Sequence, residues 1–150
     1  MNKFLALVVC VGLCACGNGA AKTAGTASVA QAQQHETKDR VEILYFHGKQ
    51  RCATCLAIEK NAKEAVEAQF ADELKRGTVV FRTIDISKAE NEPLAEKYEV
   101  AWSSLFVCQW KDGQETYENL TDYAFAHART APDTFKRGVI EKVNTLLKLK

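Results

Sequence analysis

Two cysteines separated by two residues, Cys52 and Cys55, are the side chains in this sequence best suited to chemistry. Thiol–disulfide exchange needs one thiolate that attacks and a second thiol that resolves the mixed disulfide. At the start of a helix, this spacing puts both sulfurs on the first turn, where free N–H groups and the positive end of the helix dipole favour a thiolate. We therefore predict that Cys52 is the exposed attacking sulfur and that Cys55 is the shielded resolving thiol.

Residues around the pair could support this chemistry. Arg51 immediately precedes Cys52 and, together with Lys49, would add positive charge. His47 could carry a proton or bind a metal beside the thiols, although a histidine at a strand end is more often a polar loop residue. Trp102 could flank the site and contact substrate, or it could pack in the core.

Two other uses of the cysteine pair stay open. A zinc site needs four ligands, and Cys108 and His47 are the obvious additions to the pair. However, the sequence has no second Cys-x-x-Cys pair, and Cys108 lies in an apolar stretch typical of a small buried residue. A purely structural disulfide would close a very short loop, which adds little stability. We expect redox exchange without a bound metal or other cofactor.

The elements that must position these residues follow from the hydrophobic pattern. Apolar, β-branched and aromatic runs predict strands at residues 41–46, 78–86, 105–110 and 115–120, the last two joined by a hairpin turn. Apolar residues mainly four apart predict one long amphipathic helix from the cysteine pair, ended by Gly77. These apolar residues are Leu56, Ile58, Ala62, Val66, Phe70 and Leu74.

Three further helices complete the pattern. Pro93 opens a short helix to Tyr98, for which Ser87 and Glu90 could form a capping box, and another short helix covers residues 121–128. The last helix carries an apolar stripe expected to lie in the core, made of Phe135, Val139, Ile140, Val143, Leu146 and Leu147. Because a helix joins the first two strands, we expect them to pair in parallel, which indicates an α/β fold.

This order of elements, with Cys-x-x-Cys opening the first helix, resembles the thioredoxin fold over residues 40–150. The resemblance implies a central mixed four-stranded sheet flanked by helices. Where thioredoxins have a cis-proline loop, this chain has Ser103-Ser104-Leu105, and Ser104 is our candidate site residue there. A cis bond without proline costs about 3 kcal/mol, so we expect a trans loop. The chain also lacks the family's Trp before Cys52, and Phe46 falls where thioredoxins keep a buried acid.

Two segments are closer still to one bacterial family. Tyr45-Phe46-His47 and Arg51-Cys52-Ala53-Thr54-Cys55 resemble the thioredoxin-like chains of the ArsF type, which are described as nitrophenyl compound nitroreductase subunits. That resemblance implies, as an alternative to a free-standing enzyme, a redox accessory subunit of a reductase.

The start of the chain has the pattern of an exported protein. Lys3 precedes an apolar run that ends at Leu13, the layout of a secretory signal peptide, and this run is too short to span a bilayer. Leu13-Cys14-Ala15-Cys16 resembles the lipobox of bacterial lipoproteins. By that resemblance, residues 1–15 are removed and Cys16 carries the lipid; a plain cleaved signal peptide is the alternative. The small, polar residues from 16 to 39 predict a flexible tether.

The amino-acid composition argues against some classes of function. The 150 residues are 47% hydrophobic and 26% charged, as in one ordinary globular domain. Twenty Lys and Arg balance nineteen Asp and Glu, which argues against a nucleic-acid binder. We expect a thiol–disulfide oxidoreductase in the bacterial cell envelope, outside the cytoplasm and anchored to a membrane by its N-terminal lipid. Its partners would be protein thiols and disulfides or a reductase. The alternative is a non-catalytic lipoprotein that binds a metal or a partner.

Overall fold

The structure is a computed structural model, and it describes residues 39–148. These residues lie in the second of the two units into which the chain divides, residues 33–150. The predicted signal peptide at residues 1–15, the lipidation candidate Cys16 and the tether up to residue 38 lie outside the described residues. Within residues 39–148, no helix combines the length and the apolar character that crossing a membrane requires.

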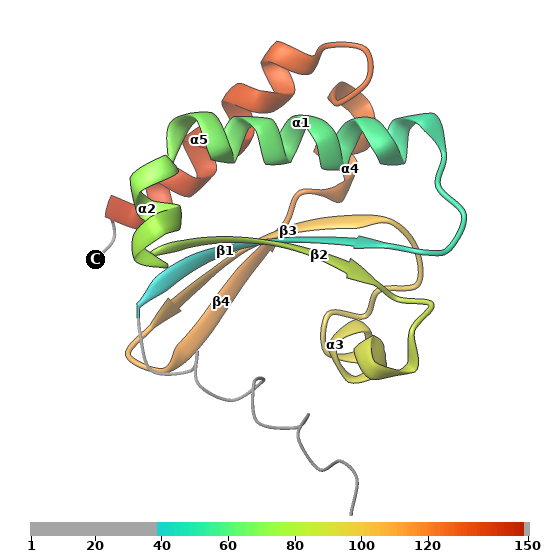
Figure 1. Cartoon of the computed structure of the whole chain (residues 1–150), viewed down its shortest axis with the longest axis horizontal. Helices are drawn as coiled ribbons and strands as arrows, with labels where there is room; N and C mark the ends of the chain where they lie inside the picture. The colour runs from blue at the N-terminus through green and yellow to red at the C-terminus, as the bar shows by residue number, and fades with distance from the viewer. Residues whose placement is uncertain (1–38, 149–150) are drawn as a thin grey trace, which may run out of the picture. The chain divides into compact units, whose positions relative to one another are not determined.

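Four strands form one mixed sheet in the order β2-β1-β3-β4 (Figure 1). β1 (Arg40–His47) runs parallel to β2 (Val79–Asp85) and antiparallel to β3 (Ser104–Lys111), and β3 pairs antiparallel with β4 (Gln114–Asn119). The helical connection after β1 allows parallel pairing, whereas the short turn at Asp112-Gly113 produces a hairpin. The predicted α/β fold with a mixed four-stranded sheet is therefore confirmed.

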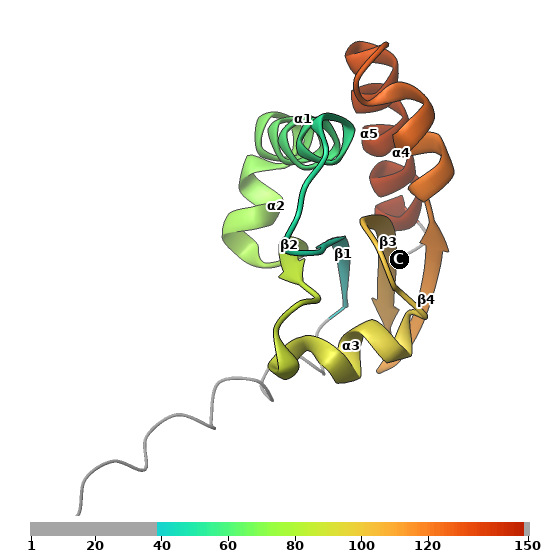
Figure 2. The same ribbon diagram turned by 90° about the vertical axis from the view of Figure 1, so that its right-hand side faces the viewer.

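Helices cover both faces of the sheet (Figures 1 and 2). One face carries α1 (Ala53–Gln69), α2 (Ala71–Arg76), α4 (Thr121–His127) and α5 (Pro132–Lys148). The other face carries α3 (Glu92–Lys97), which follows the short 3-10 helix η1 (Ala89–Asn91). Because β1 lies between β2 and β3, this arrangement buries both of its faces.

β1 has apolar residues on both faces because it lies inside the sheet. Successive side chains of a strand point to opposite faces. Val41, Ile43 and Tyr45 belong to the larger core cluster, which α1 and α5 complete. Leu44 and Phe46 belong to the smaller cluster on the α3 side. The nearly continuous apolar run in the sequence is thus explained by burial on both faces.

The predicted single long helix is wrong at Phe70. This residue leaves helical geometry (φ −122°, ψ 32°) between α1 and α2, and its side chain is buried in the larger cluster. The apolar spacing continued past the break because the ring still faces the core. Leu56 also differs from the prediction: it is 50% exposed, because it lies about 200° around the helix from Ile58. Gly77 ends α2 in the left-handed conformation, as predicted.

The predicted capping box of Ser87 and Glu90 is also wrong. Both the N–H and the hydroxyl of Ser87 donate to the Asp85 carboxylate, at 3.0 and 2.7 Å. Ser87 therefore closes a turn at the end of β2 and leaves no hydroxyl bond for a helix cap. Pro93 lies in the first turn of α3, as predicted.

Candidate dithiol site

Cys52 and Cys55 lie where the loop after β1 enters α1. Cys52 is the N-cap residue, with an extended backbone (φ −77°, ψ 165°), and the N–H of Cys55 donates a hydrogen bond to the Cys52 sulfur at 3.0 Å. The sulfur thus takes the place of the serine or aspartate oxygen that usually caps a helix. Because N–H groups and the helix dipole converge there, this position favours negative charge on Cys52 when the pair is reduced.

The two cysteines form a disulfide, with their Cα atoms 5.0 Å apart. Cys52 is exposed, whereas Cys55 is buried. An attacking sulfur must be reached by another molecule, and a resolving sulfur must lie close by and be shielded. The pair therefore has the exposures that attack by Cys52 and resolution by Cys55 require.

A hollow of about 620 Å³ lies over the disulfide. Three segments far apart in the sequence line it beside the cysteines: the loop after β1, the residues before β3, and α4. Their lining residues are Gly48, Gln50, Arg51, Ala101, Trp102, Ser103 and Phe125. Trp102 is 68% exposed and Phe125 40% exposed. Trp102 thus flanks the cysteine pair, and the alternative that it packs in the core is wrong.

The segment before β3 closes one side of the hollow. All peptide bonds within residues 39–148 are trans, which confirms the predicted trans loop. Ser103 lines the hollow. Ser104, our candidate at this position, is the first residue of β3 and is buried, and its hydroxyl donates to the Trp102 carbonyl at 3.1 Å. Ser104 therefore holds the loop in place, while its neighbour Ser103 lies against the hollow.

His47 and Cys108 do not join the cysteine pair in a metal site. His47 ends β1, and its Nδ1 lies 2.9 Å from the Gly48 carbonyl oxygen. Cys108 is fully buried in the cluster on the α3 face, where burial raises the pKa of its thiol to about 12. Within the described part of the chain, no three His, Cys, Asp or Glu side chains gather as metal ligands. Cys108 is the small buried residue that its strand predicted, and it lies among the residues packed on the α3 face of the sheet.

Arg51 belongs to a network of contacts that links the dithiol loop to α1 and β1. Its guanidinium forms an ion pair with Glu59 of α1 and lies over the Tyr45 ring, 5.6 Å from the ring centroid. The Tyr45 hydroxyl donates to the Cys55 carbonyl at 2.7 Å. Sequence reasoning missed Glu59 and Phe125 and placed Tyr45 only in a strand. Their roles depend on contacts between elements, for which the sequence carries no local signal.

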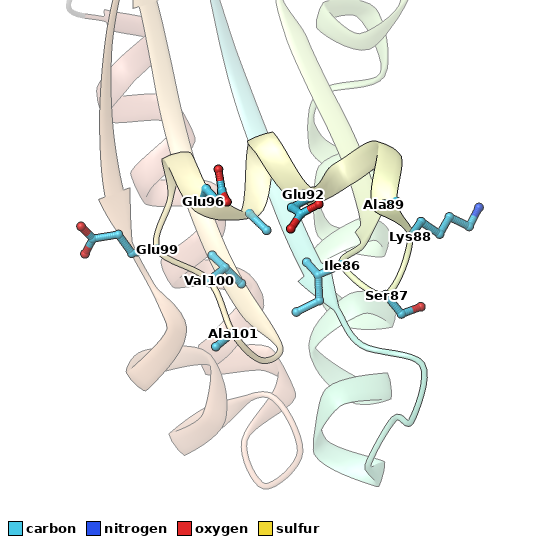
Figure 3. Close-up of a pocket in the computed structure, with 10 residues that line it drawn as sticks. Ile86, Ser87, Lys88, Ala89, Glu92, Glu96, Glu99, Val100 and Ala101 are labelled. Carbon is cyan, nitrogen blue, oxygen red and sulfur yellow. The ribbon is translucent and has the colours of Figure 1, made fainter.

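A second hollow of about 590 Å³ lies between the end of β2 and α3 (Figure 3), and Ala101 lines both hollows. Its lining includes Ile86, Val100 and Glu92. The side chains of Lys88 and Glu99 point away from it (Figure 3). The lining of this second hollow contains neither of the two bridged cysteines.

The strand order, the single parallel pair, the helices on both faces and the Cys-x-x-Cys at the start of α1 define a thioredoxin-like fold. Among solved structures, the chain is similar to a malarial protein, with 18% identity, a TM-score of 0.41, and 69% of this chain and 97% of that chain covered. It is also similar to thioredoxin-2, a component of the protein secretion machinery of the malaria parasite. For that structure the identity is 20% and the TM-score is 0.44, with 71% of this chain and 85% of that chain covered. No protein-family model matches the sequence, and no curated protein matches it significantly.

Proposed function

We propose that this protein is a thiol–disulfide oxidoreductase whose reactive sulfur is Cys52. The observation that carries the proposal is the hydrogen bond from the Cys55 N–H to the Cys52 sulfur at the start of α1. A sulfur at this position is stabilised as a thiolate, and the thiolate is the species that attacks disulfides. The exposure of Cys52 leaves it open to a second molecule.

The exchange reaction proceeds in two steps. The Cys52 thiolate attacks one sulfur of a partner disulfide, so that a mixed disulfide forms and the partner's other sulfur leaves as a thiolate, which takes up a proton. The Cys55 thiol then loses its proton and attacks the Cys52 sulfur, which restores the Cys52–Cys55 bridge and releases the partner's second thiolate. Two electrons thus pass from the dithiol to the partner, and the same steps in reverse oxidise a partner dithiol.

Polypeptides are the partners that the hollow supports best. Trp102 and Phe125 are exposed and present large apolar surfaces to the hollow over the disulfide. A cysteine carried on a polypeptide brings neighbouring side chains that can cover these rings, whereas a small thiol covers little of them. We therefore propose protein thiols and disulfides, or a protein reductase, as the partners.

We also propose that the chain is a lipoprotein of the bacterial cell envelope and acts outside the cytoplasm. The support is the lipobox-like Leu13-Cys14-Ala15-Cys16 after an apolar run, followed by polar residues to 39 that would act as a tether. The ArsF-type segments 45–47 and 51–55 support a second candidate function, that of a redox accessory subunit of a reductase.

Titration in glutathione buffers tests the redox proposal. The purified protein is equilibrated at a series of glutathione to glutathione-disulfide ratios, and free Cys52 and Cys55 are counted by alkylation and mass spectrometry. We expect one reversible two-electron transition that Cys52→Ser abolishes. A pair that never opens, or never closes again, would contradict the proposal.

Cell fractionation tests the anchor. The full-length protein should be found with the membranes, and Cys16→Ser should move it to the soluble fraction. The matched variant Cys14→Ser keeps the candidate lipid-bearing residue and should leave the distribution unchanged. Membrane retention of Cys16→Ser would rule out this anchor.

A further inference from the structure

The residue before the reactive cysteine carries a charge that the fold holds in place. Arg51 lines the hollow over the disulfide, yet its guanidinium also pairs with the Glu59 carboxylate. Both side chains are about three-quarters enclosed, with 22% and 24% of their surfaces exposed. An ion pair shielded to this degree is screened less than a pair in open solvent.

Two further contacts fix the geometry of this pair. The Arg51 guanidinium lies against the ring of Tyr45, which is fully buried on β1. The hydroxyl of Thr83, on β2, donates to the second oxygen of Glu59 at 3.2 Å. Arg51 is therefore connected to both parallel strands and to α1, the helix that carries the cysteines.

The pairing changes what Arg51 can do for the neighbouring sulfur. A lone positive charge beside Cys52 would stabilise its thiolate. When a carboxylate lies against that charge, the two fields largely cancel at a short distance. Burial alone would lower the pKa of Arg51, but the hydrogen bonds to Glu59 and Tyr45 keep this pKa above its usual value, so the guanidinium stays charged.

We propose that Glu59 is a positioning residue of the dithiol site: it holds Arg51 and partly cancels its charge, and so determines how stable the Cys52 thiolate is. This inference rests on the proposed function, in which Cys52 is the attacking sulfur. Glu59 lies seven residues beyond Cys52, about 10 Å along the helix, which is about one Debye length. Glu59 acts on the sulfur in two ways, through the direct field of its carboxylate and through its hold on Arg51.

The first measurement compares Glu59→Gln with the parent protein. The pKa of Cys52 in the reduced protein is followed by the ultraviolet absorbance of its thiolate as pH changes. The bridge is then equilibrated with glutathione: two glutathione thiols give two electrons and two protons to the disulfide, which yields both cysteine thiols and one glutathione disulfide. We expect Glu59→Gln to lower the Cys52 pKa and to shift this equilibrium toward the dithiol by about 3- to 10-fold.

Glu67→Gln is the matched control. Glu67 is the same residue type on the same helix, eight residues further on, and its exposed side chain lies 3.8 Å from Lys63. The Glu67→Gln variant removes the same charge without touching Arg51. The Cys52 pKa and the glutathione equilibrium should therefore stay unchanged. If Glu59→Gln behaves like Glu67→Gln while the parent protein cycles normally, this inference is wrong and the proposed function stands. If the parent protein shows no reversible transition, the proposed function fails.

Arg51→Gln tests the route through the guanidinium and serves as a second variant if Glu59→Gln does not fold. By itself it should raise the Cys52 pKa and shift the glutathione equilibrium toward the disulfide. Adding Glu59→Gln to Arg51→Gln should cause a smaller shift than Glu59→Gln causes in the parent protein, because only the direct field of the carboxylate is then lost. A full-size shift in the double variant, or an unchanged Cys52 pKa in Arg51→Gln, would overturn the inference.

Discussion

The backbone N–H of Cys55 donates a hydrogen bond to the sulfur of Cys52, 3.0 Å away. The first turn of α1 is thus capped by the same sulfur that we propose attacks disulfides. One contact therefore affects both the stability of the helix and the acidity of the thiol. These two effects can be separated experimentally.

Replacing Cys52 should show the capping effect in the reduced protein. Cys52→Ser replaces the sulfur by a hydroxyl that can also cap α1, whereas Cys52→Ala removes the cap. We expect the alanine variant to be less stable than the serine variant by about 1 kcal/mol. Urea unfolding under reducing conditions measures the difference, and equal stabilities would mean that the capping contact contributes nothing.

Tyr45→Phe should remove the side-chain hydrogen bond that holds the Cys55 carbonyl. The buried Tyr45 hydroxyl donates to the Cys55 carbonyl at 2.7 Å, so its loss should lower the free energy of unfolding by about 1 kcal/mol. Tyr117→Phe is the control, since Tyr117 is an exposed tyrosine on β4. If both variants lose the same stability in urea, the hydrogen bond has no special role.

Cys108 should make stability depend on pH in the alkaline range. Burial raises the pKa of its thiol from about 9 to about 12. Between these values the folded protein keeps a proton that the unfolded chain has lost. The free energy of unfolding should therefore be undiminished below pH 9 and fall as pH rises toward 12, by at most about 1.4 kcal/mol per pH unit for this group.

Urea unfolding of the disulfide-bonded protein at several pH values checks this dependence. Burial also raises the pKa of Tyr98, whose hydroxyl lies 3.4 Å from the Cys108 sulfur, so part of the slope should remain in Cys108→Ala. We expect that variant to lose stability less steeply between pH 9 and 12 than the parent. Identical slopes would show that Cys108 does not contribute.

Trp102 and Phe125 should matter for protein partners and not for the redox equilibrium. Trp102→Ala and Phe125→Ala should each lower kcat/KM for the reduction of a disulfide-bonded protein such as insulin by about 5- to 30-fold, the cost of losing an aromatic contact of 1–2 kcal/mol. Their equilibrium with glutathione should match that of the parent. Tyr117→Ala, which removes an exposed aromatic ring from β4, should keep its kcat/KM. Unchanged kcat/KM in both site variants would refute the proposal that polypeptide partners bind against these two rings.

Gly138→Ala should destabilise the packing of α4 on α5. A Cβ at Gly138 would overlap the phenol ring of Tyr123, whose hydroxyl donates to the Thr134 carbonyl at 2.6 Å. The resulting strain, of about 1–3 kcal/mol, should outweigh the gain of about 1 kcal/mol that alanine gives a helix. Thr145→Ala, at an exposed position of the same helix, is the control and should change stability little. A more stable Gly138→Ala variant in thermal unfolding would contradict this expectation.

Much of the fold could be predicted because its signals are local. The apolar run of β1 follows from burial on both faces, and the Asp112-Gly113 turn follows from residues that tolerate a positive φ. Errors arose where a residue had two comparable options. Phe70 could continue a helix or end one while keeping its ring in the core, and Ser87 could cap a helix or bind Asp85 two residues earlier.

The candidate site also has one part that local patterns predict and one part that they do not. The cysteine pair and its place at a helix start could be read from the sequence, because two-residue spacing and a strand-to-helix transition are local properties. Phe125 could not be assigned, since it reaches the hollow only because α4 packs beside α1, where the Asn61 side-chain amide donates to the Ala128 carbonyl at 2.8 Å.

Local patterns in the amino-acid sequence were sufficient to predict the dithiol, the order of the strands, and which faces of most elements are buried. The tertiary structure decided that Trp102 and Phe125 flank the disulfide and that Glu59 holds Arg51. The physical reason is that hydrophobic spacing depends on neighbours along the chain. The surroundings of a sulfur depend instead on how separate elements pack, and packing brings together residues that no local pattern connects.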